Sequence, residues 1–574
     1  MNARLPVRAA LLVVFLGSGC AAPMSSAGNG PAANAHAVPG VAAANPLAVD
    51  AGLRVLAAGG SAVDAAVAVQ AMLGLVEPQS SGLGGGGFLM HYESRTGRIT
   101  MFDGREVAPA AADSTMLLDA KGEALPFNVA VISGRATGVP GVVAMLGVAH
   151  ARFGKRPWHT LFADVEHTAD TGFAVPRRLA RFVNGNAVQA RQPDIRALFA
   201  RADGTPLQYG EKLRNPAYAA TLRAIATRGS RALLEGEIAD RIVARLREGE
   251  HASQMTRDDL ASYQPVERTP LCKPFREYSV CVPPPPSSGF AILQLLAMLE
   301  RTDIATRGPE DAQSWFLFAE ASRMMYADRD QYLGDPAFVN VPVDAMLAPD
   351  YVNSRAATIG ERAGPAPKAG VFAGVARPGD DATNEAAGTS HFIVVDRQGN
   401  VVSMTTTVES LFGSGRVVGG FALNNQMTDF SFTPVVDGLP VANRVAGKKR
   451  PRSSMAPAII LDREGRFRGA IGSPGGSAIL AYNGKLAVAL LAWGLPVQSG
   501  IELPNLVARG ERYNGEAAKF SEAIRTALAA RGITVTPGEG EDSGIQGVMI
   551  RASGGTEGGA DTRRDGTWRT LPPR

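Results

Sequence analysis

The sequence is poor in the residues that build metal centres and disulfide scaffolds. Its 574 residues include three cysteines and seven histidines, and their spacing matches no common metal-binding motif, so we expect neither a metal nor another cofactor. The net charge of +4 is small for this length and the basic residues are scattered, so nothing indicates nucleic-acid binding. No internal repeat is visible, and the 45% of hydrophobic residues predict an ordinary globular core.

Long apolar runs are also lacking after the N-terminus, so no membrane-spanning helix is predicted. A basic start, an apolar run over residues 9–16 and small residues up to Cys20 predict a signal peptide over residues 1–20. The segment ending at Cys20 resembles a bacterial lipoprotein cleavage box, although Gly17 replaces the usual aliphatic residue; a plain signal peptide with an incidental cysteine is the alternative. Residues 21–38 read as a flexible tether. We therefore expect an exported, periplasmic lipoprotein anchored at Cys20.

The two other cysteines are predicted to form a structural disulfide. Export would place them in an oxidising compartment. Cys272 and Cys281 are separated by eight residues that could fold as a hairpin and bring the two side chains opposite one another.

The first part of the mature chain is predicted to be mainly helical. Helices are expected at residues 47–58 and 61–75, and the second is apolar nearly all round, which indicates burial. Two strands, 88–92 and 99–103, follow a run of four glycines. Residues 140–370 have a mostly helical pattern.

A Gly-, Ala- and Asp-rich linker at 371–388 precedes a region of different character. Strands are expected at 391–396, 400–408, 419–424, 457–462 and 466–472, helices at 477–493 and 515–531, and a strand pair near 546–559. Helices first and antiparallel strands later predict an α+β layered sandwich.

Thr389 follows a glycine and opens one of these buried strands. A threonine hydroxyl needs a base to act as a nucleophile, and the nearest base is the residue's own α-amine, which exists only if the preceding bond is broken. Gly388 carries no side chain to obstruct attack of the Thr389 hydroxyl on its carbonyl. Gly-Thr pairs at strand starts are usually structural, so the nucleophile hypothesis depends on the motifs that follow.

Two downstream motifs complete an acyl-transfer site. Thr407 ends the returning strand of the predicted hairpin and could bond to Thr389, although β-propensity alone accounts for most threonines in strands. Gly475 and Gly476 precede a helical stretch, and consecutive backbone N–H groups at such a turn can form an oxyanion hole. A simple turn is the alternative.

Further polar residues suit the head of an amino acid. Arg105, Ser453 and Ser454 are donors suited to a carboxylate. Gln426 and Asp429 are acceptors suited to an ammonium group. A carboxylate clamp and an ammonium clamp beside an acyl-transfer nucleophile predict a γ-glutamyl substrate.

Along nearly its whole mature length the chain resembles the γ-glutamyltransferase (γ-glutamyltranspeptidase) family of N-terminal nucleophile hydrolases. The matching motifs include Gly60-Ser-Ala-Val-Asp, Glu77-Pro-Gln-Ser-Ser-Gly, Asp103-Gly-Arg-Glu-Val-Ala-Pro, Tyr326-Ala-Asp-Arg, Thr389-Ser-His-Phe, Leu423-Asn-Asn-Gln-Met, Ser453-Ser-Met-Ala-Pro and Gly472-Ser-Pro-Gly-Gly-Ser. The resemblance implies a four-layer αββα sandwich and a precursor that cuts itself into a large subunit (39–388) and a small subunit (389–574), which stay together as a heterodimer.

The resemblance also implies an activity and residue roles. The activity is transfer of the γ-glutamyl group of glutathione and related amides to water or to an amino-acid or peptide acceptor. The implied roles are nucleophile for Thr389, its partner for Thr407, oxyanion hole for Gly475 and Gly476, carboxylate binding for Arg105, Ser453 and Ser454, and amine binding for Gln426 and Asp429. The alternatives are a family acylase acting on glutaryl-type β-lactam side chains or other amides, and an uncleaved, tethered binding scaffold.

Two departures from the family pattern concern substrate choice. Glu409 stands where the family usually has an asparagine that helps to hold the glutamyl head. A carboxylate there could accept from an ammonium group, and Arg452 could neutralise its charge or could instead bind a different acyl group. The segment 431–452, which matches the lid over the pocket, is shorter and has no aromatic residue at its tip, which favours hydrolysis over transfer.

Overall fold

The computed structural model describes residues 38–383, 385–386, 388–538, 543–551 and 554–572. The predicted signal peptide and cleavage box, and all but the last residue of the predicted tether, lie outside these described residues.

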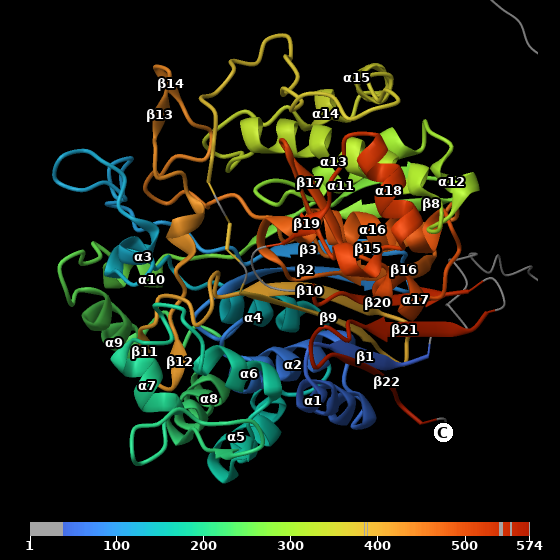
Figure 1. The fold of residues 1–574 in the computed structure, drawn as a ribbon. Helices are drawn as coiled ribbons and strands as arrows, with labels where there is room; N and C mark the ends of the chain where they lie inside the picture. Colours follow the sequence, from blue (N-terminus) through green and yellow to red (C-terminus); the bar gives the residue numbers. More distant parts are fainter. Residues whose placement is uncertain (1–37, 384, 387, 539–542, 552–553, 573–574) are drawn as a thin grey trace, which may run out of the picture.

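Two antiparallel sheets form the centre of the molecule (Figure 1). The strands of the seven-stranded sheet are, in spatial order, β22 (Thr567–Thr570), β1 (Gly40–Ala43), β9 (Thr389–Val395), β10 (Val401–Thr407), β2 (Gly86–Glu93), β3 (Arg98–Asp103) and β6 (Val266–Arg268). Those of the six-stranded sheet are β21 (Thr556–Ala560), β20 (Gln546–Ile550), β16 (Phe467–Gly472), β15 (Ala458–Asp462), β8 (Tyr278–Val282) and β7 (Leu271–Phe275).

Strand β9 shows how the layers are packed. Alternate residues of a strand point to opposite faces, and both faces of β9 are buried. Ile393 and Val395 pack between the two sheets, against residues such as Ile459 and Val548 of the second sheet. Phe392 and its alternate neighbours pack on the opposite face, against the helices that cover the first sheet.

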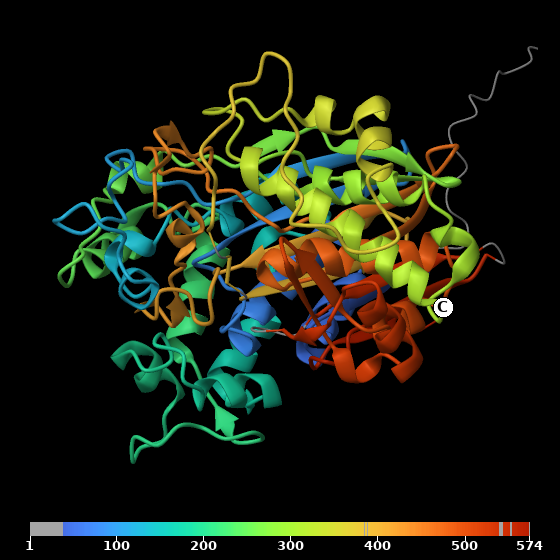
Figure 2. The same ribbon diagram turned by 45° about the horizontal axis from the view of Figure 1, so that its top comes forward.

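Helices cover the outer face of each sheet. The first sheet is covered by α1 (Pro46–Ala57), α2 (Ala62–Val76) and α4 (Val142–Phe153), and the second by α11 (Gly289–Leu299), α13 (Ala312–Tyr332) and α16 (Ile479–Leu491) (Figure 1). The predicted four-layer αββα sandwich is therefore confirmed. The region around α5 (Ala163–Thr171) and α8 (Pro216–Arg228), coloured teal to green, projects from one side of it (Figure 2).

Two of the predicted elements are wrong in extent. Residues 419–424 contain only the two-residue strand β12 (Phe421–Ala422), paired with β11 (Val417–Val418), because Gly419 and Gly420 take φ values of 56° and 80° and turn the chain sharply. The helix expected at 515–531 is α18 (Glu522–Ala530).

The sequence pattern also missed short strands. β1 and β22 pair with each other near the edge of the first sheet. β6, β7 and β8 lie inside the region that we expected to be mostly helical. Strands this short leave little room for the alternating pattern that identifies a strand.

The predicted disulfide is confirmed. Cys272 and Cys281 lie directly opposite one another in the β7–β8 pair, with their Cα atoms 4.1 Å apart. None of the helices in the described part of the chain is long and apolar enough to cross a membrane.

Candidate active site

Thr389 and Thr407 lie opposite each other in the first sheet. The turn between β9 and β10 is held by the Asp396 carboxylate, which accepts the backbone N–H groups of Gln398 and Asn400 at 2.8 and 3.0 Å. This turn sets the register in which Thr407 pairs with Thr389. Directly opposed residues share a face of the sheet, and their hydroxyl oxygens are 3.3 Å apart.

The Thr407 hydroxyl also reaches the bond that precedes Thr389. It donates a hydrogen bond to the Gly388 carbonyl oxygen at 2.7 Å, and its oxygen accepts the backbone N–H of Glu409 at 2.8 Å. Gly388 is packed so tightly that a Cβ there would lie 2.3 Å from the Glu409 carbonyl oxygen. Only glycine fits at this position while the chain is intact.

The predicted site residues converge on one small cavity. Arg105, Thr389, Thr407, Glu409, Gln426, Asp429, Ser453, Ser454 and Gly476 all line it, together with Glu385 and Ala386. The cavity measures about 20 Å³, room for about one water molecule. Gly475, the remaining predicted residue, is the neighbour of Gly476 in the turn between β16 and α16.

The chain just before Thr389 fills most of this site. We call its described residues, 381–383, 385, 386 and 388, the pre-cleavage segment. Gly476 takes φ +54°, and a Cβ on it would lie 2.6 Å from the carbonyl oxygens of both Glu385 and Ala386. Glycine at this turn therefore lets the pre-cleavage segment pack against it.

The Glu385 carboxylate is held by two arginines and a serine. Arg452 Nε donates to it at 2.9 Å, and Arg329 Nη2 and the Ser454 hydroxyl also donate to it. Burial alone would raise the pKa of Glu385, but the charges of Arg329 and Arg452 hold it at about 2. Ser454, a predicted carboxylate ligand, thus already binds a carboxylate of the chain itself.

Sequence reasoning missed Arg329 and Glu385 as site residues. Arg329 ends the family-like motif Tyr326-Ala-Asp-Arg, which was the only signal pointing to it. Arg452 contacts Glu385 and, at 2.8 Å, Asp381. The carboxylates that pair with Arg452 therefore lie in the pre-cleavage segment. In the intact chain Arg452 pairs with these carboxylates and not with Glu409, the first of the two roles considered for it.

Arg105 and Asp429, predicted to bind opposite ends of the substrate head, pair with each other in the intact chain. Arg105 Nη2 is 2.5 Å from Asp429 Oδ2, and Gln426 Nε2 donates to the same oxygen at 2.6 Å. Burial raises the pKa of Asp429, and the charge of Arg105 opposes this rise. Gln426 Oε1 is buried and has no hydrogen-bond partner among the described residues.

The Glu409 carboxyl group occupies the other side of the cavity. One of its oxygens accepts the Ser410 hydroxyl at 2.6 Å and the Asn425 side-chain amide, and the other accepts the Ala386 backbone N–H at 3.2 Å. Burial, reinforced by the nearby Asp429, raises the pKa of Glu409 well above its usual value. The pre-cleavage segment thus supplies one of the hydrogen bonds that Glu409 accepts.

Ser453 and the lid region complete the surroundings. The Ser453 hydroxyl accepts the Met455 backbone N–H at 3.1 Å. The segment 431–452 contains the short hairpin of β13 (Val435–Val436) and β14 (Leu439–Pro440), which projects from the sandwich (Figure 1). Asp437 and Gly438 form its tip.

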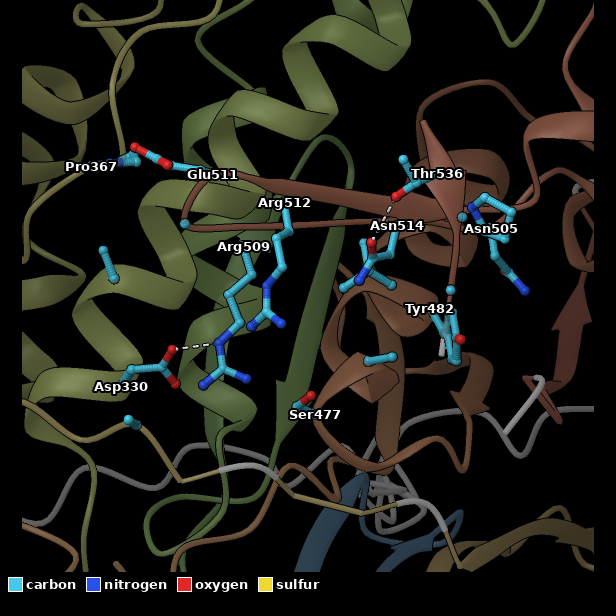
Figure 3. A pocket seen from close by; sticks show the side chains of 18 of the residues that line it. Asp330, Pro367, Ser477, Tyr482, Asn505, Arg509, Glu511, Arg512, Asn514 and Thr536 are labelled. Carbon is cyan, nitrogen blue, oxygen red and sulfur yellow. Dashed lines mark hydrogen bonds and ion pairs between the residues drawn. The ribbon is translucent and has the colours of Figure 1, made fainter. Parts of the chain in front are cut away.

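A much larger cleft adjoins the site. It has a volume of about 1180 Å³ and is shown in Figure 3. Asp381 and Thr383 of the pre-cleavage segment form part of its wall, as does Ser477, which follows the glycine turn. Arg509 and Arg512 line it from strands β17 (Leu506–Arg509) and β18 (Arg512–Gly515).

Comparison with known proteins agrees with this geometry. Residues 48–570 match the family model described as gamma-glutamyltranspeptidase. A glutathione hydrolase proenzyme of Bacillus subtilis is 34% identical over 542 residues, covering 92% of this chain and 90% of that protein. The acylase ACY 1 proenzyme of Pseudomonas sp. (strain SE83) is 34% identical over 532 residues, with 91% and 92% covered.

A solved structure is similar over the same length. The crystal structure of cephalosporin acylase from Bacillus halodurans superposes with a TM-score of 0.82 at 26% sequence identity, covering 94% of this chain and 97% of that one. The resemblance inferred from the motifs is confirmed, and the chain is an enzyme of the γ-glutamyltranspeptidase family.

Proposed function

We propose that the chain is a self-cleaving γ-glutamyltransferase and glutathione hydrolase in which Thr389 first cuts the chain and then serves as the catalytic nucleophile. The observation that carries the proposal is the position of the Thr407 hydroxyl, 3.3 Å from the Thr389 hydroxyl oxygen and 2.7 Å from the Gly388 carbonyl oxygen. A hydroxyl nucleophile beside a carbonyl that already accepts a hydrogen bond is the arrangement an acyl shift requires.

Cleavage would proceed by an N→O acyl shift. The Thr389 hydroxyl oxygen attacks the Gly388 carbonyl carbon, and the Thr407 hydroxyl stabilises the oxyanion that forms on the Gly388 oxygen. The C–N bond breaks, the Thr389 nitrogen takes up the proton that the hydroxyl loses, and an ester remains. Water hydrolyses this ester to a Gly388 carboxylate and a free Thr389 amine. The two subunits, 39–388 and 389–574, would remain together because β1 of the large subunit pairs with β9 and β22 of the small one.

Turnover would reuse the same oxygen with the new amine as its base. The amine takes the proton of the Thr389 hydroxyl, and the hydroxyl oxygen attacks the γ-glutamyl amide carbon. The backbone N–H groups of Gly475 and Gly476 receive the oxyanion, and the amine of the leaving group departs with the proton. Water or an acceptor amine then resolves the γ-glutamyl ester.

The substrate head would take the place of the pre-cleavage segment. Its α-carboxylate would bind Arg105, Ser453 and Ser454. Its ammonium group would bind Gln426, Asp429 and Glu409. Two acceptors support this orientation. Glu409 Oε1 accepts only the Ala386 N–H of the pre-cleavage segment, and Gln426 Oε1 has no partner, in both cases among the residues that the structure describes.

A second candidate is an acylase acting on glutaryl-type amides. Two observations favour it: the similarity to the acylases over most of the chain, and the high pKa of Glu409, because a protonated carboxyl group binds an ammonium group less strongly. The two candidates are separated by comparing γ-glutamyl and glutaryl 4-nitroanilides on the cleaved enzyme. A γ-glutamyltransferase hydrolyses the first faster, and an acylase the second.

The nucleophile is tested with Thr389→Ala and Thr389→Ser. The alanine variant should stay intact on a denaturing gel and turn over no donor, whereas the serine variant, which keeps a hydroxyl, should still cut itself. N-terminal sequencing of the small fragment should read Thr-Ser-His-Phe. A wild-type chain that stays intact at every pH tried would instead indicate the uncleaved scaffold.

We also propose that the protein is exported to the periplasm and anchored through Cys20. The sequence pattern of residues 1–20 supports this proposal. Labelling of cells with a radioactive fatty acid should mark the wild type, and Cys20→Ser should lose the label.

A further inference from the structure

A cluster of charges connects the nucleophile cavity with the large cleft. Arg329, Arg452 and Arg509 share three carboxylates, those of Asp330, Asp381 and Glu385. Arg509 Nε is 2.7 Å from Asp330, and Arg329 Nη1 is 2.9 Å from Asp330. The side chains of Arg329 and Arg452 are fully buried, so their charges depend on these partners.

Arg452 bridges two of these carboxylates. Its Nε is 2.9 Å from Glu385 Oε1, and its Nη1 is 2.8 Å from Asp381 Oδ2. Its Nη2 donates to the Thr383 carbonyl oxygen at 3.3 Å. All three of these partners belong to the pre-cleavage segment.

Glu385 and Ala386 of this segment line the cavity at Thr389, so after cleavage the segment has to move before a substrate can bind there. With the segment in place the cavity at Thr389 holds about one water molecule, so the segment has to withdraw for turnover. Its departure takes away Glu385 and Asp381 and leaves three guanidinium groups with Asp330. A buried charge without a partner is strongly unfavourable, so the emptied site is suited to two anionic groups.

A γ-glutamyl head supplies one of the two. Its α-carboxylate can take the position of the Glu385 carboxylate, which already contacts Ser454. The position of Asp381 would then be open, and Asp381 is part of the wall of the 1180 Å³ cleft. The head occupies the small cavity, so the leaving group has to extend into open space, and the cleft provides it.

Arginine and carboxylate side chains both line the cleft: Arg509 and Arg512, together with Asp330, Glu511 and Glu516. In Figure 3, Arg509 and Arg512 point into the cleft from strands β17 and β18, and Asp330, on the opposite side, accepts a hydrogen bond from Arg509. Arg512 is exposed and makes no ion pair within 4 Å among the described residues. A leaving group beside these strands meets the cationic groups of Arg509 and Arg512 and the amide of Asn514, with the Glu511 carboxylate between the two arginines in the chain.

We propose that Arg452, supported by Arg329 and Arg509, forms a second carboxylate subsite that favours leaving groups and acceptors carrying a carboxylate of their own. In the precursor, Asp381 of the pre-cleavage segment occupies this subsite. The inference rests on the proposed function, because it concerns the group released from, or added to, the γ-glutamyl ester.

Two donors that differ by one carboxylate test the inference. They are γ-glutamyl-4-nitroanilide and γ-glutamyl-3-carboxy-4-nitroanilide, and the readout is the ratio of their kcat/KM values per cleaved small subunit. Because a hydrogen bond to a charged group contributes substantially to binding, the wild type should favour the carboxylated donor by about tenfold or more. Arg452→Met should bring the ratio close to one, even if the change at the head position slows both donors.

Control variants separate the charge from general damage. Arg466→Met removes a surface arginine that pairs with Asp462 and should keep the wild-type ratio. Because Arg452 also holds the pre-cleavage segment, Arg452→Met could fail to cleave itself. Arg452→Lys then decides the question, since a lysine keeps the charge but cannot contact two carboxylates through separate nitrogens as Arg452 does. Its kcat/KM ratio should lie between the wild-type ratio and a ratio of one.

Acceptors distinguish the two sources of the carboxylate. With γ-glutamyl-4-nitroanilide as donor, transfer to glycylglycine is compared with transfer to glycylglycine amide. A preference for the free acid that Arg452→Met removes places the acceptor in the subsite, and a preference confined to the donor pair places only the leaving group there. Either supports the inference.

The possible failures differ from each other. A cleaved wild type that hydrolyses both donors equally and transfers equally to both acceptors would overturn the second subsite and leave the proposed function standing. An unchanged kcat/KM ratio in Arg452→Met would also overturn the second subsite and leave the proposed function standing. A cleaved wild type that hydrolyses neither donor would contradict the proposed function, and the inference with it.

Discussion

Removal of the Thr407 hydroxyl is the most direct test of how the chain cuts itself. In Thr407→Val the β-branched shape is kept, so the strand should be preserved. The variant loses the 2.7 Å donor to the Gly388 carbonyl oxygen and the 3.3 Å contact with the Thr389 hydroxyl. Loss of one donor to a developing oxyanion typically costs about 2.7–4 kcal/mol, a factor of about 10² to 10³ in rate. We expect self-cleavage to slow by that factor.

The assay is cell-free synthesis followed by a denaturing gel, which follows the intact chain and the fragment 389–574 from the moment of folding. Thr407→Ser keeps the donor and should cleave at a rate near the wild type. Thr406→Val is the matched control: this threonine bonds to the Gly86 carbonyl oxygen at 3.2 Å, away from the scissile bond, so its loss should leave the rate unchanged.

Two results would refute the reasoning. One is cleavage of Thr407→Val at the wild-type rate, which would mean that the contact with Gly388 has no part in the reaction. The other is equal slowing in Thr406→Val, which would trace the effect to the sheet. Because Thr407→Val also leaves the Glu409 N–H without its partner, at a cost of about 1–3 kcal/mol, circular dichroism should establish that the variant is folded.

Two further predictions concern the pre-cleavage segment. Gly476→Ala should slow self-cleavage strongly, because a Cβ would lie 2.6 Å from the Ala386 carbonyl oxygen. The control Gly494→Ala, with φ +65° and open space around it, has similar backbone strain and should cleave normally on the same gel. Equal slowing in both variants would attribute the effect to backbone strain alone. Burial raises the pKa of Glu409 in the folded chain, so its contribution to stability is fully present below its unfolded pKa near 4.5 and is lost as pH rises, by up to about 1.4 kcal/mol per pH unit. In the uncleaved Thr389→Ala background, Glu409→Gln should therefore raise Tm more at pH 8 than at pH 4.5, and a gain independent of pH in thermal melts would contradict this assignment.

Local features of the sequence predicted the nucleophile pair and much of the framework. The Thr389–Thr407 pairing follows from a short hairpin whose turn is closed by Asp396, and a period of two places both hydroxyls on one face. The helices α1 and α2 end within about two residues of their predicted bounds, because glycines and a capping serine mark their ends. Nearest-neighbour interactions decide such features.

The tertiary structure decided how the charges are paired. Arg452 and Glu385 are 67 residues apart, and Arg105 and Asp429 are 324 residues apart, and in the sequence each resembles an ordinary surface charge. Only the folded structure shows that the Ser454 hydroxyl donates a hydrogen bond to Glu385 of the same chain, and that Arg105 pairs with Asp429 while the chain is intact. Coulombic attraction depends on distance and on the exclusion of water, and neither quantity is set until the two sheets and their helices have packed together.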